Sequence, residues 1–305
     1  MMSKKKKLKL FKVEYQNKHQ SFKQSLSNNR GFTLLELCVS MVLGLLVLVV
    51  IYAIHDMQQD TFKRETMKLS SQRNLRNSLN LMETEIRMAG YDRMETDLFG
   101  ITDVRMDANS NGTITFTFDD GNAGNANNGT LNGDETITYA IYDSPTTSST
   151  GNFDLGRTAG GGATELLAEG IEALGFAFAF DNDEDGVLDF NDDDADGEID
   201  LPPGGNEGIY WAVDTDGDNI LDSNLDTNRD GRIDVGDGVA GLPFTVSPER
   251  IRAVKIFLLS RTRGPDKGYV DKHSYVVGFR RIINPGDSFR RQLMELTVKC
   301  RNLGL

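Results

Sequence analysis

The sequence predicts an α+β protein in which a long N-terminal helix, half membrane-spanning and half amphipathic, packs on an antiparallel β-sheet. Three observations predict this class: an apolar run near the N-terminus, several segments of alternating apolar and polar residues, and a set of Asp-rich repeats among them. A helix that precedes a set of strands buries its apolar stripe against one face of their sheet. The Asp-rich repeats form a predicted insertion at residues 181–238.

The apolar run Phe32–Ile54 contains 23 residues, and Glu36 is its only charged side chain. At about 1.5 Å per residue, a helix of this length spans about 35 Å, which exceeds the roughly 30 Å core of a bilayer. A carboxylate within a membrane span is costly unless it is paired, so Glu36 is a candidate functional residue. An ordinary signal anchor would explain the length of the run but not the Glu.

The helical pattern continues beyond the apolar run. Apolar residues recur at intervals of four, three and four, at Leu75, Leu79, Met82 and Ile86. This spacing places them on one face of a helix, and Gly90 is a typical stop signal. We therefore expect a helix over residues 32–90, followed by a globular β-rich domain at residues 91–305.

Six segments are predicted to be strands because their residues alternate or are strongly apolar. They are Thr113–Phe118, Glu135–Tyr142, Gly175–Phe180, Ile251–Leu259, Ser274–Phe279 and Gln292–Val298. The first two should pair as a hairpin through the Gly- and Asn-rich residues 119–134. Ile251–Leu259 is apolar on both faces and should be a central strand. Residues 142–162, rich in Ser, Thr and Gly, are expected to form an exposed loop.

The residues G-F-T-L-L-E, with a basic segment before them and the apolar run after them, resemble the signal of type IV prepilins. The resemblance implies that a prepilin peptidase cleaves after Gly31 and methylates the new N-terminus at Phe32. It also implies that Glu36 pairs with the terminal amine of a neighbouring subunit. Such a pair would neutralise two charges in apolar surroundings.

Two further motifs resemble PilW-type minor pilins. The predicted helix ends in R-x-A-G-Y, at Arg87, Ala89, Gly90 and Tyr91, and the C-terminal segment Ser288–Asn302 ends in R-N, like the closing strand of that family. The resemblance implies an assembly protein. Its implied partners are a major pilin, other minor pilins, the prepilin peptidase and methyltransferase, and the inner membrane before assembly.

Charge is distributed unevenly along the chain. Residues 1–31, the predicted leader, carry a net charge of +8, whereas the whole chain carries −13. By the positive-inside rule, the leader should stay cytoplasmic and the acidic domain should lie across the membrane. The resemblance to prepilins implies that this domain is periplasmic, and later extracellular in a pilus. The acidic bulk argues against binding of nucleic acid. Cys38 and Cys300 lie in separate regions and are not expected to pair.

The acidic tract Asp181–Asp237 follows the pattern D-x-[DN]-x-[DN]-G, in which oxygens at loop positions 1, 3, 5, 7, 9 and 12 bind calcium. Two stretches match it fully. The first has ligands at Asp181, Asp183, Asp185, the Val187 carbonyl, Asp189 and Asp192. The second has ligands at Asp226, Asn228, Asp230, the Arg232 carbonyl, Asp234 and Asp237.

Two partial copies lie between the complete ones. One contains Asp192, Asp194, Asp196, the Glu198 carbonyl and Asp200, but has Pro203 at position 12. The other contains Asp214, Asp216, Asp218 and Asp222, with Asn219 instead of Gly at position 6 and Leu225 at position 12. Position 8 is apolar in every copy, at Leu188, Ile199, Leu221 and Ile233. We expect this residue to attach each loop to a small core.

A solvated acidic linker is the alternative interpretation, because runs of charge are usually unstructured. The tract contains twenty acidic residues and two arginines, so it would repel itself without counter-ions. The recurring register favours calcium, at the weak affinity of about 10⁻⁴–10⁻³ M that is typical of extracellular modules. The loops resemble thrombospondin type 3 or dockerin-like repeats more than an EF-hand, because position 12 is Asp and no helical pattern flanks them.

No nucleophile, metalloprotease or phosphate-binding motif occurs, and the three histidines are scattered, so an enzyme is not expected. The sequence predicts a minor type IV pilin that primes, tips or joins a pilus and is stabilised by calcium. Two alternatives remain open at this point. A minor pseudopilin of a type II secretion system would carry the same signal, and a calcium-dependent tip adhesin would use the domain to bind a carbohydrate or a surface.

Overall fold

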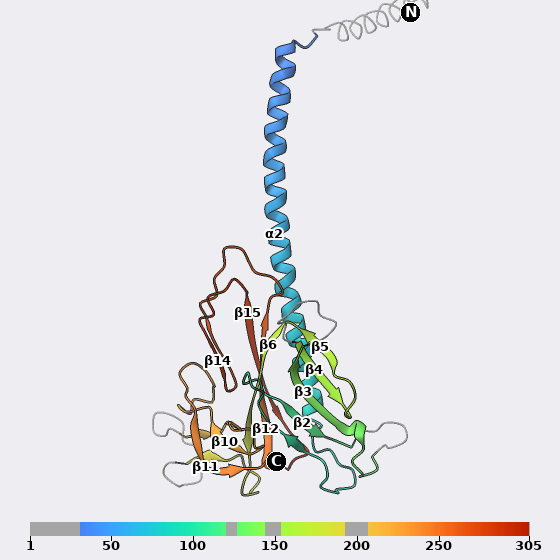
Figure 1. The fold of residues 1–305 in the computed structure, drawn as a ribbon, viewed down its shortest axis with the longest axis vertical. Helices are drawn as coiled ribbons and strands as arrows, with labels where there is room; N and C mark the ends of the chain where they lie inside the picture. Colours follow the sequence, from blue (N-terminus) through green and yellow to red (C-terminus); the bar gives the residue numbers. More distant parts are fainter. Residues whose placement is uncertain (1–30, 120–126, 144–153, 193–206, 305) are drawn as a thin grey trace, which may run out of the picture. The chain divides into compact units, whose positions relative to one another are not determined.

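The computed structural model describes residues 31–119, 127–143, 154–192 and 207–304. The chain divides into two compact units, Met1–Phe62 and Lys63–Leu305. One long helix, α2 (Leu34–Ile86), contributes to both units, and the strands belong to the second (Figure 1). Each unit is described separately below.

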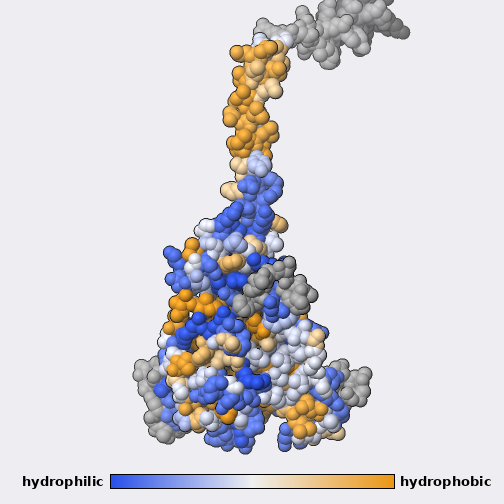
Figure 2. Space-filling view, in the orientation of Figure 1, coloured by the Kyte–Doolittle hydropathy of each residue, from blue (hydrophilic) through white to orange (hydrophobic). Residues whose placement is uncertain are grey.

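In the first unit, α2 is coated with hydrophobic side chains (Figure 2). Within the described part of the chain, α2 is the one helix that is long and apolar enough to cross a membrane, and none of its apolar window is buried. Leu35, Leu43 and Val49 are all more than half exposed. Because exposed apolar surface on this scale is unfavourable in water, this segment is suited to a bilayer or to other apolar helices.

In the second unit, the remaining turns of α2 are amphipathic and contribute one face to the core. The buried apolar residues of this face are the predicted ones, Leu75, Leu79, Met82 and Ile86. The helix ends at Ile86, four residues before the predicted stop. Gly90 completes the turn that follows, with φ of +75° and its amide donating to the carbonyl of Thr117 at 3.0 Å. A left-handed residue just beyond a helix end is a position that favours glycine.

Two antiparallel sheets make up most of the second unit. The five-stranded sheet contains, in spatial order, β1 (Ile101–Asp103), β2 (Ile114–Thr117), β3 (Thr136–Tyr142), β4 (Asp154–Ala159) and β5 (Glu165–Glu169). The six-stranded sheet contains β11 (Ala240–Val246), β10 (Leu221–Asn224), β9 (Ala212–Val213), β6 (Ile171–Phe180), β12 (Ile251–Arg261) and β15 (Arg291–Lys299).

Two small hairpins and two short 3₁₀ helices complete the described elements. The hairpins are β13 (Ser274–Val277) with β14 (Arg280–Ile283), and β7 (Phe190–Asn191) with β8 (Gly208–Ile209). The 3₁₀ helices are η1 (Gly133–Glu135) and η2 (Pro248–Arg250).

Strand β12 separates two hydrophobic clusters. Val254, Ile256 and Leu258 face the first cluster, which contains the apolar face of α2 and the inner face of the five-stranded sheet. Phe257 and Leu259 face the second cluster, which contains Trp211 and residues of the acidic tract. The prediction that this strand is central and covered on both faces is therefore confirmed, because it pairs with β6 on one side and β15 on the other.

The predicted α+β class is confirmed, as are the six predicted strands and the hairpin of β2 with β3. The prediction of an exposed loop over residues 142–162 is wrong for its second part, because Asp154–Ala159 forms β4 and pairs with β3. Its sequence D-L-G-R-T-A has no apolar alternation, and only Leu155 supplies a large buried side chain. Cross-strand pairing, which local composition does not reveal, determines this strand.

Candidate functional site

The predicted processing site is exposed at the start of α2. Phe32 is 87% exposed, and nothing lies within 4 Å of a Cβ placed on Gly31. The predicted leader at residues 1–30 lies outside the described residues. In the described chain, the peptide bond between Gly31 and Phe32 is not covered by other residues, as a cleavage site requires.

Glu36 has a role within its own chain that the sequence analysis did not include. Its carboxylate accepts hydrogen bonds from the amide and the hydroxyl of Thr33, at 2.9 and 3.0 Å. The Thr33 hydroxyl in turn accepts from the amide of Glu36 at 3.2 Å. This reciprocal arrangement is a capping box, which satisfies backbone donors that a helix start otherwise leaves unpaired. The spacing T-x-x-E was a visible signal for it.

The acidic tract folds into loops that continue from strands of the six-stranded sheet. We name three of them by their first residue: the Asp181 loop (181–192), the Asp214 loop (214–225) and the Asp226 loop (226–237). Asp181 and Asp214 directly follow β6 and β9, and Asp226 comes two residues after the end of β10. Each of the three is only 1% exposed. The predicted ligands Asp194, Asp196, Glu198 and Asp200 of the remaining copy lie outside the described residues, and Asp192 is the last described residue before that gap.

The three described loops share one hydrogen-bond pattern. The amide at position 6 donates to the carboxylate at position 1, from Gly186, Asn219 and Gly231 to Asp181, Asp214 and Asp226, at 3.0, 2.7 and 2.8 Å. The amide at position 7 donates to the carboxylate at position 5, at 2.8, 2.9 and 2.8 Å. The backbone thus turns each loop back on its own carboxylates and holds them in place before any ion is bound.

The departure at position 6 of the Asp214 loop has a physical explanation. Asn219 has φ of +68°, close to the +86° and +79° of Gly186 and Gly231. Asn is one of the few side-chain residues that adopt this left-handed conformation readily. The loop therefore keeps the turn of the complete copies although it lacks their glycine.

Asn219 also joins the Asp214 loop to the other sheet. Its side-chain oxygen accepts from the amide of Val104 and its side-chain nitrogen donates to the carbonyl of Thr102, both at 3.0 Å. Thr102 belongs to β1, at the edge of the five-stranded sheet. A glycine at this position could not make either bond, so the deviation from the repeat is also the point of attachment.

Two of the loops gather carboxylates closely enough to hold a metal ion. One group is Asp181, Asp183 and Asp189, the other is Asp214, Asp216 and Asp218, and in each group the ligand oxygens lie within 4.8 Å of one another. The described Asp226 loop contains no such group of three. It has Asn228 at position 3, and Asp237 turns inward to accept from the amides of Thr227 and Asp234 at 3.0 and 2.9 Å.

Several predicted ligands bond to the protein itself. Asp185 and Asp230 each accept the amide at position 7, and Asp222 accepts from the hydroxyl of Thr215 at 2.8 Å. Asp234 accepts the amide of Gly236 at 2.7 Å. The structure brings six of the predicted carboxylates into two groups, and these four lie outside both groups.

The electrostatics of the tract favour a bound cation. Burial, with the nearby charges of Asp183, Asp181 and Asp185, raises the pKa of Asp189 to about 6. Burial also raises the pKa of Asp226, and the charges of Asp237 and Asp230 add to this effect. Both shifts show that negative charge is concentrated here at a cost, which a cation at the loop would remove.

Two residues below the Asp226 loop were missed by the sequence analysis. Lys255 of β12 is 7% exposed, donates from Nζ to the carbonyl of Gly231 at 2.9 Å and lies 4.1 Å from the ring centroid of Trp211. Burial lowers the pKa of Lys255, and the charges of Glu295 and Asp226 oppose that shift. The alternation of β12 places this lysine on the same face of the strand as Phe257 and Leu259. Nothing in the sequence shows which loop covers it.

The apolar residues at position 8 attach the loops to the core, as expected for the described copies. Ile233 is buried in the second hydrophobic cluster, and Leu188 packs against that cluster. Leu221 is buried in the first cluster. Trp211 lies within the second cluster, so the only tryptophan of the chain is close to two of the loops.

The start of the chain matches a known sequence model. The family described as the prokaryotic N-terminal methylation motif matches residues 26–52, which include Gly31, Phe32 and Glu36. The chain carries a prepilin-type methylation motif. Together with the exposed apolar helix, the motif fits a membrane-anchored, pilin-like protein with a structural role rather than an enzyme. It also implies processing by a prepilin peptidase and assembly with other pilins.

Comparisons over the whole chain are less informative than the N-terminal motif. A solved type IV-like pilin from Thermus thermophilus is similar at 15% sequence identity, over 76% of this chain and 98% of the other, with a TM-score of 0.38. A likeness at this level carries no argument about function. No curated protein matches the chain. The narrower resemblance to PilW-type pilins stays a prediction.

Proposed function

We propose that the protein is a minor subunit of a type IV pilus, anchored by α2 and carrying a calcium-stabilised domain in its second unit. The observation that supports this most strongly is the methylation motif at residues 26–52, at the head of a helix whose apolar window is not buried in the described chain. Cleavage after Gly31 would leave a cationic N-terminus next to the apolar run. A subunit with such an end needs an anionic partner when its helix packs among others.

Glu36 is the proposed anionic partner, provided by a neighbouring subunit. Its carboxylate is exposed and, among the described residues, bonds only to Thr33. A carboxylate oxygen has lone pairs for more than one donor, so the capping bonds leave capacity for a terminal amine. The same residue would then complete the helix start of its own chain and set the register of the next one.

Calcium is the proposed ion of the acidic tract. All predicted ligands are oxygens, and calcium accepts six to eight of them in flexible geometry, whereas magnesium demands a near-ideal octahedron and releases its water reluctantly. The two carboxylate groups at Asp181 and Asp214 are the preferred sites. In our proposal the Asp226 loop binds more weakly, because Lys255 already supplies a cation beneath it.

The decisive experiment determines the N-terminus of the protein that is recovered from sheared surface filaments. Intact-mass analysis should give a chain that begins with methylated Phe32 and co-purifies with pili. A chain that retains residues 1–31 in filaments would contradict the proposal. Recovery only with a secretion complex, and not with pili, would assign the protein to a type II secretion system instead.

A further inference from the structure

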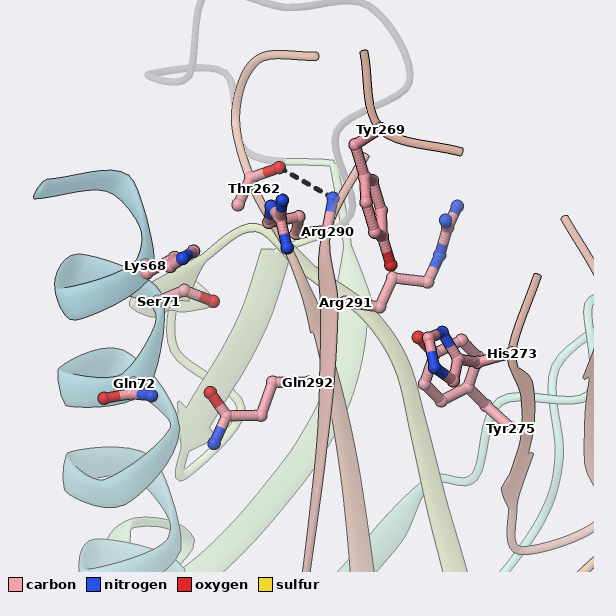
Figure 3. Close-up of a pocket in the computed structure, with 10 residues that line it drawn as sticks. All are labelled: Lys68, Ser71, Gln72, Thr262, Tyr269, His273, Tyr275, Arg290, Arg291 and Gln292. Atoms are coloured by element: carbon pink, nitrogen blue, oxygen red, sulfur yellow. Dashed lines mark hydrogen bonds between the residues drawn. The ribbon is translucent and has the colours of Figure 1, made fainter. Parts of the chain in front are cut away.

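The second unit contains a cavity of about 420 Å³ beside α2, far along the chain from the acidic tract. Its walls come from one helical turn of α2 on one side and from β13, β15 and the residues before them on the other (Figure 3). Cavities of roughly 300–1,000 Å³ with a few convergent polar groups are typical of small-ligand sites. None of the predicted processing, assembly or metal-binding residues lines this cavity.

Arg290 is fixed in this cavity with its outer face free. Its Nε donates to Asp266 at 2.6 Å, and its guanidinium carbon lies 4.1 Å from the ring centroid of Tyr269. Asp266 is 4% exposed and is also 3.0 Å from Nε of Arg64, so its position is determined from two sides. Among the described residues, neither terminal nitrogen of Arg290 has a hydrogen-bond partner. The guanidinium is therefore an oriented fork, a geometry that matches a carboxylate.

Two side-chain amides line the same space. Gln72 extends from α2 and Gln292 from β15, and the amide of Gln292 points toward α2 in Figure 3. Both residues are half-buried, and neither amide is hydrogen-bonded within the described parts of the chain. Each amide offers donors and an acceptor, which is the combination that recognises hydroxyl groups.

The charges of the lining residues favour a ligand with a negative charge. Lys68, Arg290 and Arg291 line the cavity, and no carboxylate of the described residues does. The side chain of Arg291 is only 2% exposed and is held by Glu172, Asp271 and Asp287, so it supports the wall rather than the ligand. Lys68 pairs only with the exposed Glu65 at 3.1 Å, an interaction weak enough to be exchanged.

We propose that this cavity binds an acidic sugar, with its carboxylate on Arg290 and its hydroxyls on Gln72 and Gln292. An apolar ligand would leave the guanidinium and both amides without partners, which is costly in a partly buried site. A basic ligand would meet Lys68 and Arg290. A carboxylate without hydroxyls would leave the two amides unused.

The test uses the full-length chain in detergent, with D-galacturonic acid and its disaccharide as probes in calorimetry and saturation-transfer NMR. Galactose and its disaccharide are the neutral controls. We expect the acidic sugars to saturate below about 10 mM, with the neutral ones at least about tenfold weaker. Arg290→Lys keeps the charge but removes the fork and should weaken binding by about tenfold or more.

Gln72→Ala is the second variant, on the surface of α2, and should weaken binding of the sugar but not of acetate. Arg263→Lys is the matched control, because Arg263 is 69% exposed, pairs with Glu169 and does not line the cavity. Circular dichroism verifies that each variant is folded. Absence of saturation for galacturonic, glucuronic and mannuronic acids would overturn the proposal. So would equal losses in Arg290→Lys and Arg263→Lys, or full affinity in Gln72→Ala.

Discussion

Asn302 donates from its side-chain amide to the backbone carbonyl of Arg87 at 3.3 Å, across 215 positions of sequence. A second bond of 3.4 Å joins the same amide to Met88. Arg87 and Met88 lie in the turn directly after the last residue of α2, so Asn302 ties down that turn from the other end of the chain. The two motifs near Gly90 and Asn302, which the sequence shows only as separate resemblances, therefore form one joint.

Gly90→Ala should destabilise the second unit. A Cβ at Gly90 would overlap the side chain of Leu303, and φ of +75° is strained for alanine. Alanine at such a position costs more than about 1 kcal/mol of the free energy of unfolding. Denaturant unfolding of the full chain in detergent measures this loss in the free energy of unfolding. Gly100→Ala is the control, because its Cβ would meet the same Leu303 at an ordinary 3.7 Å. Equal stability of the two variants would disprove the strain at Gly90.

Glu36→Gln separates the two roles of Glu36. Glutamine retains the capping box but removes the charge, whereas leucine removes both. If a neighbour's amine needs the carboxylate, both variants should insert in the membrane and both should be lost from filaments. The amount of the subunit in the membrane fraction measures insertion, and its amount in sheared pili measures incorporation. Normal incorporation of Glu36→Gln would assign Glu36 to the cap alone.

Calcium should stabilise the protein and change the fluorescence of Trp211. At calcium concentrations about a hundredfold above Kd, one site adds about 2.7 kcal/mol to the free energy of unfolding. Asp183→Ala and Asp216→Ala should each remove part of that gain, and their losses should add because the loops are separate. Asp143→Ala, an exposed acid outside the tract, should have little effect. If several millimolar calcium causes no shift in melting temperature and no heat of binding, the tract is a charged surface and not a calcium site.

Asn219→Gly tests the attachment of the Asp214 loop. Glycine keeps the left-handed turn of the complete copies but removes the two bonds to Thr102 and Val104. At about 0.5–1.5 kcal/mol for each hydrogen bond, stability should fall by about 1–3 kcal/mol. Calcium affinity should change little, since the ligands remain. If calorimetry instead shows lost calcium binding with unchanged stability, Asn219 positions ligands rather than sheets.

The sequence predicted the elements whose periodicity is strong and missed those fixed by distant partners. The face of α2 at Leu75 and Leu79 and the two-sided strand β12 follow directly from apolar spacing. Strands β4 and β10 contain few apolar residues and form because neighbouring strands offer hydrogen bonds. No local pattern encodes such a partner.

In the candidate sites too, the sequence predicted what local spacing encodes and missed most of what the fold determines. The repeat register located the carboxylates of the Asp181 and Asp214 loops, because ligand spacing is local. It did not show that Asp237 turns inward onto amides of its own loop. Nor did it show that Lys255 lies under Gly231, because that depends on which strand passes below the loop. The cavity at Arg290 combines α2 with β15, more than two hundred positions apart, and left no sequence motif.

The position of the C-terminal residues has a consequence for biogenesis. Strand β15 supplies one neighbour of the central β12, and Cys300 and Leu303 fill the space between the sheet and the end of α2. In the proposed orientation the C-terminus crosses the membrane last, so the core cannot close until translocation is complete. A prematurely terminated chain would then keep its anchor but expose apolar strands to proteases. Under our proposal, an incomplete polypeptide would be degraded before it could join a filament.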